Sequence, residues 1–157
     1  VALIGHSLGG YTALALAGGR PHSVPRGPDE KPHALIPVPP ADARVRALVL
    51  LAPALPWFMA PGSLRGVLLP LLVRVGEQDE HTPPGFVGHV LRGLPGVAPL
   101  DYRVVPNAGH FSFLSPFPAA RVSPQFPPSQ DPPGFDRARF HEQELYPAVL
   151  AFLRRFL

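Results

Sequence analysis

The 157-residue chain contains no cysteine. This absence excludes disulfide bonds, thiolate metal sites and a cysteine nucleophile. The chain also lacks a membrane-length apolar run: two prolines interrupt the longest apolar stretch, residues 45–60, and a membrane span needs about 18 uninterrupted apolar residues. The sequence therefore predicts no transmembrane segment. It assigns neither a compartment, since cytoplasmic and periplasmic or secreted locations both stay open, nor an oligomeric state.

Clustered positive charge is scarce as well, although the formal net charge is +3. The arginines are scattered singly, and the one adjacent pair is Arg154 and Arg155 near the C-terminus. Neutralising nucleic-acid phosphates requires lysines and arginines gathered along a groove or a helix face. No nucleic-acid partner is therefore predicted.

Proline and glycine are plentiful, at 24 and 15 residues, and the prolines are unevenly distributed. Seven lie between residues 21 and 40 and seven more between residues 116 and 133. The sequence between these two segments is rich in leucine, valine and alanine, as expected for an ordinary core. We therefore predict one domain over residues 1–157, interrupted by proline-rich loops at residues 20–44 and 115–135.

Strand and helix patterns alternate along the chain. Apolar runs typical of buried parallel strands occupy residues 1–5, 45–51, 71–75 and 100–105. Helical patterns occupy residues 9–17, 84–94 and 145–156, and Pro147 should kink the last helix or begin its final segment. This alternation predicts an α/β fold, with a mostly parallel sheet of about four strands and helices on both faces.

A Gly-x-Ser-x-Gly motif, Gly5-His6-Ser7-Leu8-Gly9, joins the first expected strand to the first expected helix. A strand, a sharp turn and a helix in this order are typical of a nucleophile elbow, which exposes a serine at the carboxyl edge of a sheet. Side chains at Gly5 or Gly9 are expected to collide with the neighbouring strand or helix. The main-chain N–H of Leu8 would then face a developing oxyanion. The alternative reading is a serine that only caps a glycine-rich helix.

An acid and a base follow in the order that this arrangement requires. Asp79 lies in the loop after the strand at residues 71–75, and His110 lies in the loop after the strand at residues 100–105. A histidine can take the serine proton while a buried carboxylate orients its ring. Glu77 and Glu80 compete with Asp79, but Asp79 lies in the turn itself. For His110, the preceding glycine is expected to form a tight turn.

The other six histidines are less suitable as the base. His6 occupies the variable position of the elbow, from which its side chain should point away from Ser7. His81 next to Asp79 makes an incomplete metal site, so neither a metal nor a cofactor is predicted. The remaining four are expected at the surface or satisfied in the core: His22, His33, His89 and His141.

Several segments resemble the bacterial predicted dienelactone hydrolases, which are in turn similar to platelet-activating-factor acetylhydrolases. The resemblance rests on residues 5–15, residues 76–79, Asn107-Ala108-Gly109-His110-Phe111, residues 131–136 and Phe140-His141. It implies a serine esterase of the α/β-hydrolase fold with Ser7, Asp79 and His110 as the catalytic triad and Leu8 in the oxyanion hole. True dienelactone hydrolases use a cysteine nucleophile, so Ser7 points to an esterase-like enzyme.

The resemblance also implies what would precede these residues. Proteins of this fold carry about four more strands before the elbow strand, together with the loop that supplies the second oxyanion N–H. We therefore expect the chain to represent the C-terminal half of such a domain. The expected reaction is hydrolysis of a short-chain ester, an acyl lipid or a lactone. An acyltransferase with the same triad, an inactive fragment and a non-catalytic binding protein remain alternatives.

Apolar residues between two of the strands are candidates for a substrate pocket. Trp57, Phe58 and Met59 follow the strand at residues 45–51, and Phe111 follows His110. An apolar pocket there would favour an uncharged small-molecule ester. Packing of these residues onto the core is the alternative.

Overall fold

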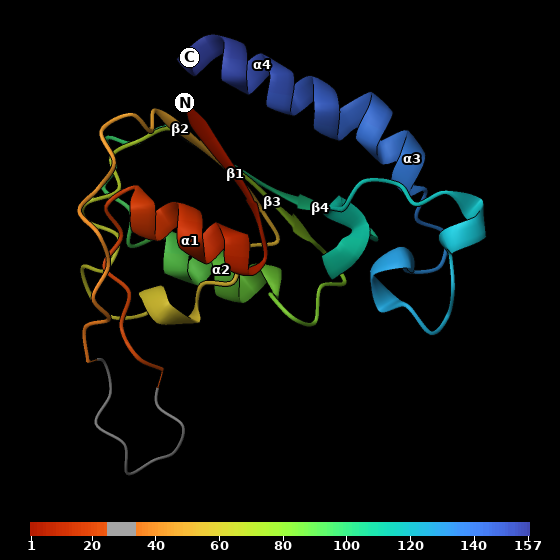
Figure 1. Ribbon diagram of the computed structural model, residues 1–157, viewed down its shortest axis with the longest axis horizontal. Coiled ribbons are helices and arrows are strands. Elements are labelled where there is room, and N and C mark those ends of the chain that lie inside the picture. Colours follow the sequence, from red (N-terminus) through yellow and green to blue (C-terminus); the bar gives the residue numbers. More distant parts are fainter. Residues whose placement is uncertain (25–33) are drawn as a thin grey trace.

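A four-stranded parallel sheet forms the centre of the computed structural model, which describes residues 1–24 and 34–157 (Figure 1). The strands follow one another across the sheet in sequence order: β1 (Ala2–His6), β2 (Ala47–Leu51), β3 (Leu71–Gly76) and β4 (Leu100–Val105). All three pairings are parallel. The carboxyl ends of the strands therefore meet at one edge of the sheet.

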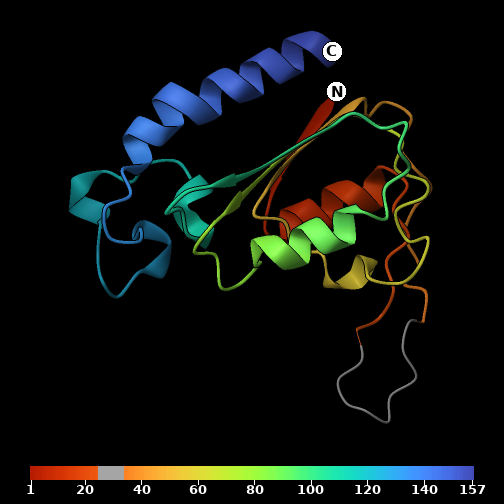
Figure 2. The same ribbon diagram turned by 180° about the vertical axis from the view of Figure 1, so that it is seen from behind.

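Helices cover both faces of this sheet (Figures 1 and 2). One face carries α1 (Leu8–Leu16) and α2 (Pro84–Leu91), together with the 3₁₀ turn η1 (Pro56–Phe58). The other face carries a C-terminal helix built from α3 (Arg137–Phe140), the π-helical segment η5 (His141–Leu145) and α4 (Tyr146–Phe156).

The two central strands are buried on both faces, and their side chains alternate between two cores. Leu48 and Leu50 of β2 pack with α1 and α2, while Ala47 and Val49 pack with α4. Every residue of β2 and β3 is buried. This is why their sequences are almost continuous apolar runs, in which the buried Arg74 of β3 is the one charged residue.

The predicted α/β class is confirmed, with four parallel strands and helices on both faces. The strand expected at residues 100–105 has those bounds, and the other strands, α1, α2 and α4 differ from expectation by three residues or fewer at each end. The helical segments α3 and η5 that precede α4 were not expected. Pro147 is the second residue of α4, directly after the π-helical segment, and so begins the final helical segment.

The two proline-rich segments contain little regular structure. In the first, residues 20–24 and 34–44 contain an isolated bridge between His22 and Leu35, while His33 lies outside the described residues. The second contains two 3₁₀ turns, η3 (Ala119–Arg121) and η4 (Pro127–Ser129). In the described part of the chain, no helix is long and apolar enough to cross a membrane.

Candidate active site

Ser7 joins β1 to α1 in a strained conformation. Its φ of 53° and ψ of −117° lie outside the regions that non-glycine residues ordinarily occupy. Such a conformation costs about 1–3 kcal/mol and persists only where the surrounding structure imposes it. Here the Ser7 N–H donates to the Leu51 carbonyl at 3.1 Å, and its own carbonyl accepts from Ala54 at 2.9 Å. These two hydrogen bonds, to the last residue of β2 and to the segment that follows it, therefore fix the conformation of the turn.

The glycines around Ser7 have different roles from those expected. A Cβ on Gly5 would lie 2.7 Å from the Gly10 nitrogen and would overlap the carbonyl of Gly9, so Gly5 is required for the close approach of strand and helix. A Cβ on Gly10 would lie 2.6 Å from Pro53 Cβ. A Cβ on Gly9 would meet nothing within 4 Å, so the predicted collision at Gly9 is wrong. The glycine that is required is Gly10, because the start of the helix packs there against Pro53.

We expect Gly5→Ala to destabilise the fold and Gly9→Ala to leave it unharmed. The alanine at position 5 must displace main-chain atoms, which costs about 2 kcal/mol or more. The alanine at position 9 enters open space in a helix that favours it over glycine. Urea unfolding of the two variants measures the difference, and equal loss of stability in both would contradict this account.

Asp79 and His110 form a buried pair at the carboxyl edge of the sheet. His110 Nδ1 lies 2.9 Å from Asp79 Oδ2, and the two side chains are 6% and 0% exposed. Asp79 follows β3, and His110 begins η2 (His110–Phe113) after β4. Because the carboxylate can only accept when ionised, this contact favours a proton on Nδ1 and leaves Nε2 able to accept another.

Further donors hold the Asp79 carboxylate in place. Oδ1 accepts from the main-chain N–H groups of His81 and Thr82, at 2.9 and 2.8 Å, and Oδ2 accepts from the Thr82 hydroxyl at 2.7 Å. Burial is the largest influence on this carboxyl and opposes its ionisation, but the hydrogen bonds from His110 and Thr82 outweigh it. The pKa of Asp79 therefore lies below its ordinary value, and the group is charged at neutral pH.

The turn that delivers His110 is made differently from the prediction. Asn107 has the positive φ, 56°, whereas Gly109 is extended at φ −101° and ψ −175°. Gly109 is instead needed for packing, because a Cβ there would lie 3.1 Å from Pro132 Cγ. On the other side of the loop, a Cβ on Gly76 would lie 2.8 Å from the Ala108 carbonyl carbon. Two close packing contacts thus confine the loop.

Two histidines that the sequence did not assign to the site flank His110. The rings of His6 and His81 each lie 4.8 Å from the His110 ring, measured between centroids, and the His81 ring is stacked on it. His6 Nε2 also donates to the main-chain carbonyl of His110 at 2.8 Å. Burial lowers the pKa of His6 below its ordinary value, with repulsion from His110 in the same direction. No signal in the sequence pointed to either contact.

The His6 contact places His110 beside the residue that precedes Ser7. Within residues 1–24 and 34–157, the Ser7 hydroxyl forms no hydrogen bond, to His110 or to any other group. The structure thus brings Asp79 and His110 together and places Ser7 at the same sheet edge, with an unpaired hydroxyl. Catalytic hydrogen bonds are often long or absent without substrate.

The residues expected to line a pocket lie in different places. Phe58 is 2% exposed in the core, Trp57 packs against Tyr11 with ring centroids 5.1 Å apart, and Met59 is 51% exposed. Phe111 lines a cavity of about 300 Å³ beside His110, which Trp57, Phe58 and Met59 do not line. The other walls come from residues 78–81 and from the proline-rich segment 124–132: Gln78, Glu80, His81, Gly109, Pro124, Pro127, Gln130, Asp131 and Pro132.

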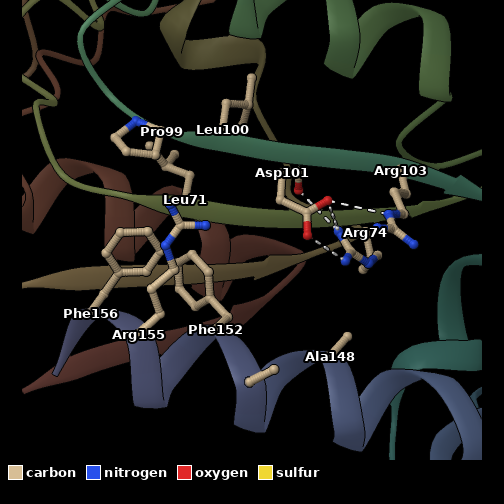
Figure 3. A pocket seen from close by; sticks show the side chains of 11 residues that line it. Leu71, Arg74, Pro99, Leu100, Asp101, Arg103, Ala148, Phe152, Arg155 and Phe156 are labelled. Atoms are coloured by element: carbon tan, nitrogen blue, oxygen red, sulfur yellow. Dashed lines mark hydrogen bonds and ion pairs between the residues drawn. The ribbon is translucent and has the colours of Figure 1, made fainter.

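A second cavity, of about 380 Å³, lies between β4 and α4 at the other end of the strands (Figure 3). Asp101 accepts there from the buried Arg74, at 2.9 Å, and from Arg103, at 3.3 Å. The cavity adjoins Leu71 and Leu100, which begin their strands, whereas Asp79 and His110 follow the strand ends. It is therefore separate from the candidate active site.

In the described residues, no three histidine, aspartate or glutamate side chains are grouped so that they could hold a metal ion.

Comparison with known proteins gives a likeness of fold. No protein-family model and no curated protein matches the chain. Among solved structures, an α/β serine hydrolase homologue from Coxiella burnetii has 21% identity and a TM-score of 0.48 over 69% of this chain and 40% of that one. A predicted CIB-like hydrolase from Thermoplasma acidophilum has 19% identity and a TM-score of 0.43, over 68% of this chain and 40% of that one.

A third structure, a thermophilic esterase from the planctomycete Thermogutta terrifontis, has 16% identity and a TM-score of 0.43, over 69% of this chain and 45% of that one. The chain therefore spans less than half the length of each of these three proteins. At such identities the likeness concerns the fold alone. The arrangement of Ser7, Asp79 and His110 has to be judged on its own geometry.

Proposed function

We propose that the chain carries the catalytic centre of a serine hydrolase that cleaves carboxylic esters, with Ser7 as nucleophile, His110 as base and Asp79 as the orienting acid. The observation that carries this proposal is the buried Asp79–His110 pair at the sheet edge where Ser7 is held at φ 53° with an unpaired hydroxyl. The chain would then represent part of an α/β-hydrolase domain, similar to the predicted dienelactone hydrolases.

The reaction starts with attack of Ser7 Oγ on the ester carbonyl carbon while His110 Nε2 takes the hydroxyl proton. Asp79 stabilises the resulting imidazolium and keeps its Nδ1 proton in place. His110 then returns its proton to the departing alkoxide, which leaves as an alcohol and gives an acyl-serine. A water molecule, deprotonated by His110, attacks this acyl group, and the carboxylic acid and free Ser7 are released.

Leu8 supplies one donor for the negative charge that develops on the carbonyl oxygen. It is the first residue of α1, so its N–H has no partner in the helical hydrogen-bond pattern and lies at the positive end of the helix. One oxyanion donor contributes about 100- to 1,000-fold in rate. A second donor would come from residues outside this sequence.

The cavity beside His110 supports an uncharged ester as the substrate. Its walls carry the aromatic rings of Phe111 and His81 and the rings of three prolines, and none of the described lysines and arginines lines it. The exposed side chain of Glu80 at this wall disfavours an anion. Short-chain esters, acyl lipids and lactones all meet this requirement.

Labelling with a fluorophosphonate tests the proposal directly in the full-length protein. The probe reacts with a serine only where a base activates it, so a single adduct on the peptide that contains Ser7 is the expected result. Mass spectrometry of a digest locates the adduct, and prior incubation with a nitrophenyl ester should slow its formation. An unlabelled folded protein, or an adduct on another residue, would refute the assignment.

A further inference from the structure

The segment 131–141, Asp-Pro-Pro-Gly-Phe-Asp-Arg-Ala-Arg-Phe-His, takes no part in the proton transfers proposed above, yet it lies against the loop that carries His110. We propose that Asp131 and Arg137 are positioning residues, which act through Ser112 to hold His110 in line with Asp79. This inference rests on the proposed function for its kinetic consequences. Its structural basis is a continuous set of buried and partly buried hydrogen bonds.

Ser112 links the segment to the residue that precedes His110. The Ser112 hydroxyl donates to Asp131 Oδ1 at 2.7 Å and accepts from the Gly109 N–H at 3.0 Å. Ser112 is fully buried. Because a buried hydroxyl of this kind has one proton and must point it at an acceptor, Asp131 fixes its orientation and leaves a lone pair for Gly109.

Arg137 fixes Asp131 in turn. Its guanidinium binds the carboxylate through two contacts, Nε to Oδ2 at 2.9 Å and Nη2 to Oδ1 at 3.1 Å. Two further donors bind the carbonyls of Pro128 and Gln130, both at 3.0 Å. Arg137 is 6% exposed, so its planar guanidinium is held rigidly by these hydrogen bonds. Removing one partner of this ion pair would leave the other buried and unpaired, at a large cost in stability.

The far side of the His110 loop is held by the same segment. His141 Nε2 donates to the Ser112 carbonyl at 2.9 Å, and Phe140 packs edge-on against Phe113 with ring centroids 5.8 Å apart. Contacts at Gly109, before His110 in the sequence, and at Ser112 and Phe113, after it, thus fix the main chain on both sides of His110. The orientation of the imidazole is therefore set by Asp79 and also by a main chain that residues 131–141 keep in place.

Loss of this support should reduce catalysis more than binding. A displacement of about 1 Å in a catalytic group costs about 100-fold in rate. We expect Asp131→Asn to lower kcat about 10- to 100-fold, with a smaller change in KM. We also expect the NMR signal of the His110 Nδ1 proton to shift and to exchange faster with water. This NMR signal should be missing from the spectrum of His110→Ala, which assigns it to His110.

Asp136→Asn is the matched control. Asp136 lies in the same segment and is exposed, and its carboxylate caps α3 by accepting from the Arg139 N–H at 3.0 Å. This variant should lower the urea midpoint while leaving kcat and the His110 signal unchanged. Equal effects of both variants on kcat would show that general destabilisation, and not positioning, is responsible.

Ser112→Ala keeps the test decisive if Asp131→Asn does not fold, because it removes the link while the Asp131–Arg137 pair stays intact. It should lower kcat about 10-fold and shift the His110 signal in the same direction. A normal His110 signal in either variant would overturn the inference. The signal does not depend on turnover, so an inactive wild-type protein would refute the proposed function and still leave this inference decided by the spectra.

Discussion

Replacing Ser7 with alanine is expected to lower ester hydrolysis by at least about 10,000-fold, since removal of the nucleophile from a serine hydrolase removes nearly all of its rate enhancement. The fold should remain intact, because the turn at Ser7 is imposed by the main-chain bonds to Leu51 and Ala54 and not by the serine side chain. Hydrolysis of a short nitrophenyl ester measures the rate, and urea unfolding checks the fold.

The other hydroxyls near the site make poor substitutes for Ser7. Ser112 is buried and donates to Asp131, and Thr12 donates to the Leu8 carbonyl at 3.2 Å. Ser115→Ala serves as the control, because Ser115 is exposed and lies two residues after η2. Retention of more than about 1% of the rate in Ser7→Ala would mean that another group is the nucleophile.

Asp79→Asn should cost nearly as much, about 10,000-fold in kcat. An asparagine fits the same space but can present its NH₂ group to His110, so that Nδ1 becomes the acceptor and the proton moves to Nε2. A histidine in that tautomer cannot accept a proton from Ser7. Steady-state kinetics on the same ester measures the loss.

Glu80→Gln and Glu77→Gln are the controls for Asp79, because the sequence left both glutamates as rivals for the acid. Both are exposed, and Glu77 accepts from the Asn107 N–H at 2.9 Å without touching His110. Neither change should lower kcat by more than about threefold, since exposed charges contribute little. A large loss in Glu80→Gln with normal activity in Asp79→Asn would reassign the acid.

Asp79 also makes stability depend on pH. Its pKa in the folded chain lies below its ordinary value, so its ionised form stabilises the fold at neutral pH, and this contribution is lost as the pH falls through the folded pKa. The difference in unfolding free energy between the wild-type chain and Asp79→Asn should therefore shrink between pH 7 and about pH 3. A difference independent of pH would mean that folding leaves the pKa of Asp79 unchanged, and a difference that grows as the pH falls would mean that folding raises it.

Much of the fold could be predicted because its strands have unusual composition. β2 and β3 are buried on both faces and are almost entirely apolar, with Arg74 as the one charged residue, a pattern that local sequence reveals directly. The Ser7 turn, Asp79 and His110 could be placed at one edge because parallel strands end together. The choice of Asp79 and His110 also used the order of serine, acid and histidine that follows a nucleophile elbow.

The surroundings of His110 could not be predicted, because they depend on contacts between distant segments. His6 and Asp131 approach His110 from different parts of the chain, and neither has a local pattern that names its partner. The cavity beside His110 was not anticipated either: Phe58, predicted to line a pocket, is in the core, whereas Pro124 and Pro127 line that cavity. A proline-rich loop has no hydrophobic periodicity, so the sequence did not predict where in the fold this loop would pack.

The hydrogen bond between His6 and His110 joins residues 104 positions apart, and the Asp79–His110 contact spans 31 positions. Contacts between distant residues form slowly in folding, because the entropy of closing the intervening chain has to be overcome first. Helices and short loops form within microseconds, whereas His110 lies beside His6 only once the strands between them have paired. If Ser7 and His110 act as we propose, reactivity at Ser7 would report a late stage of refolding.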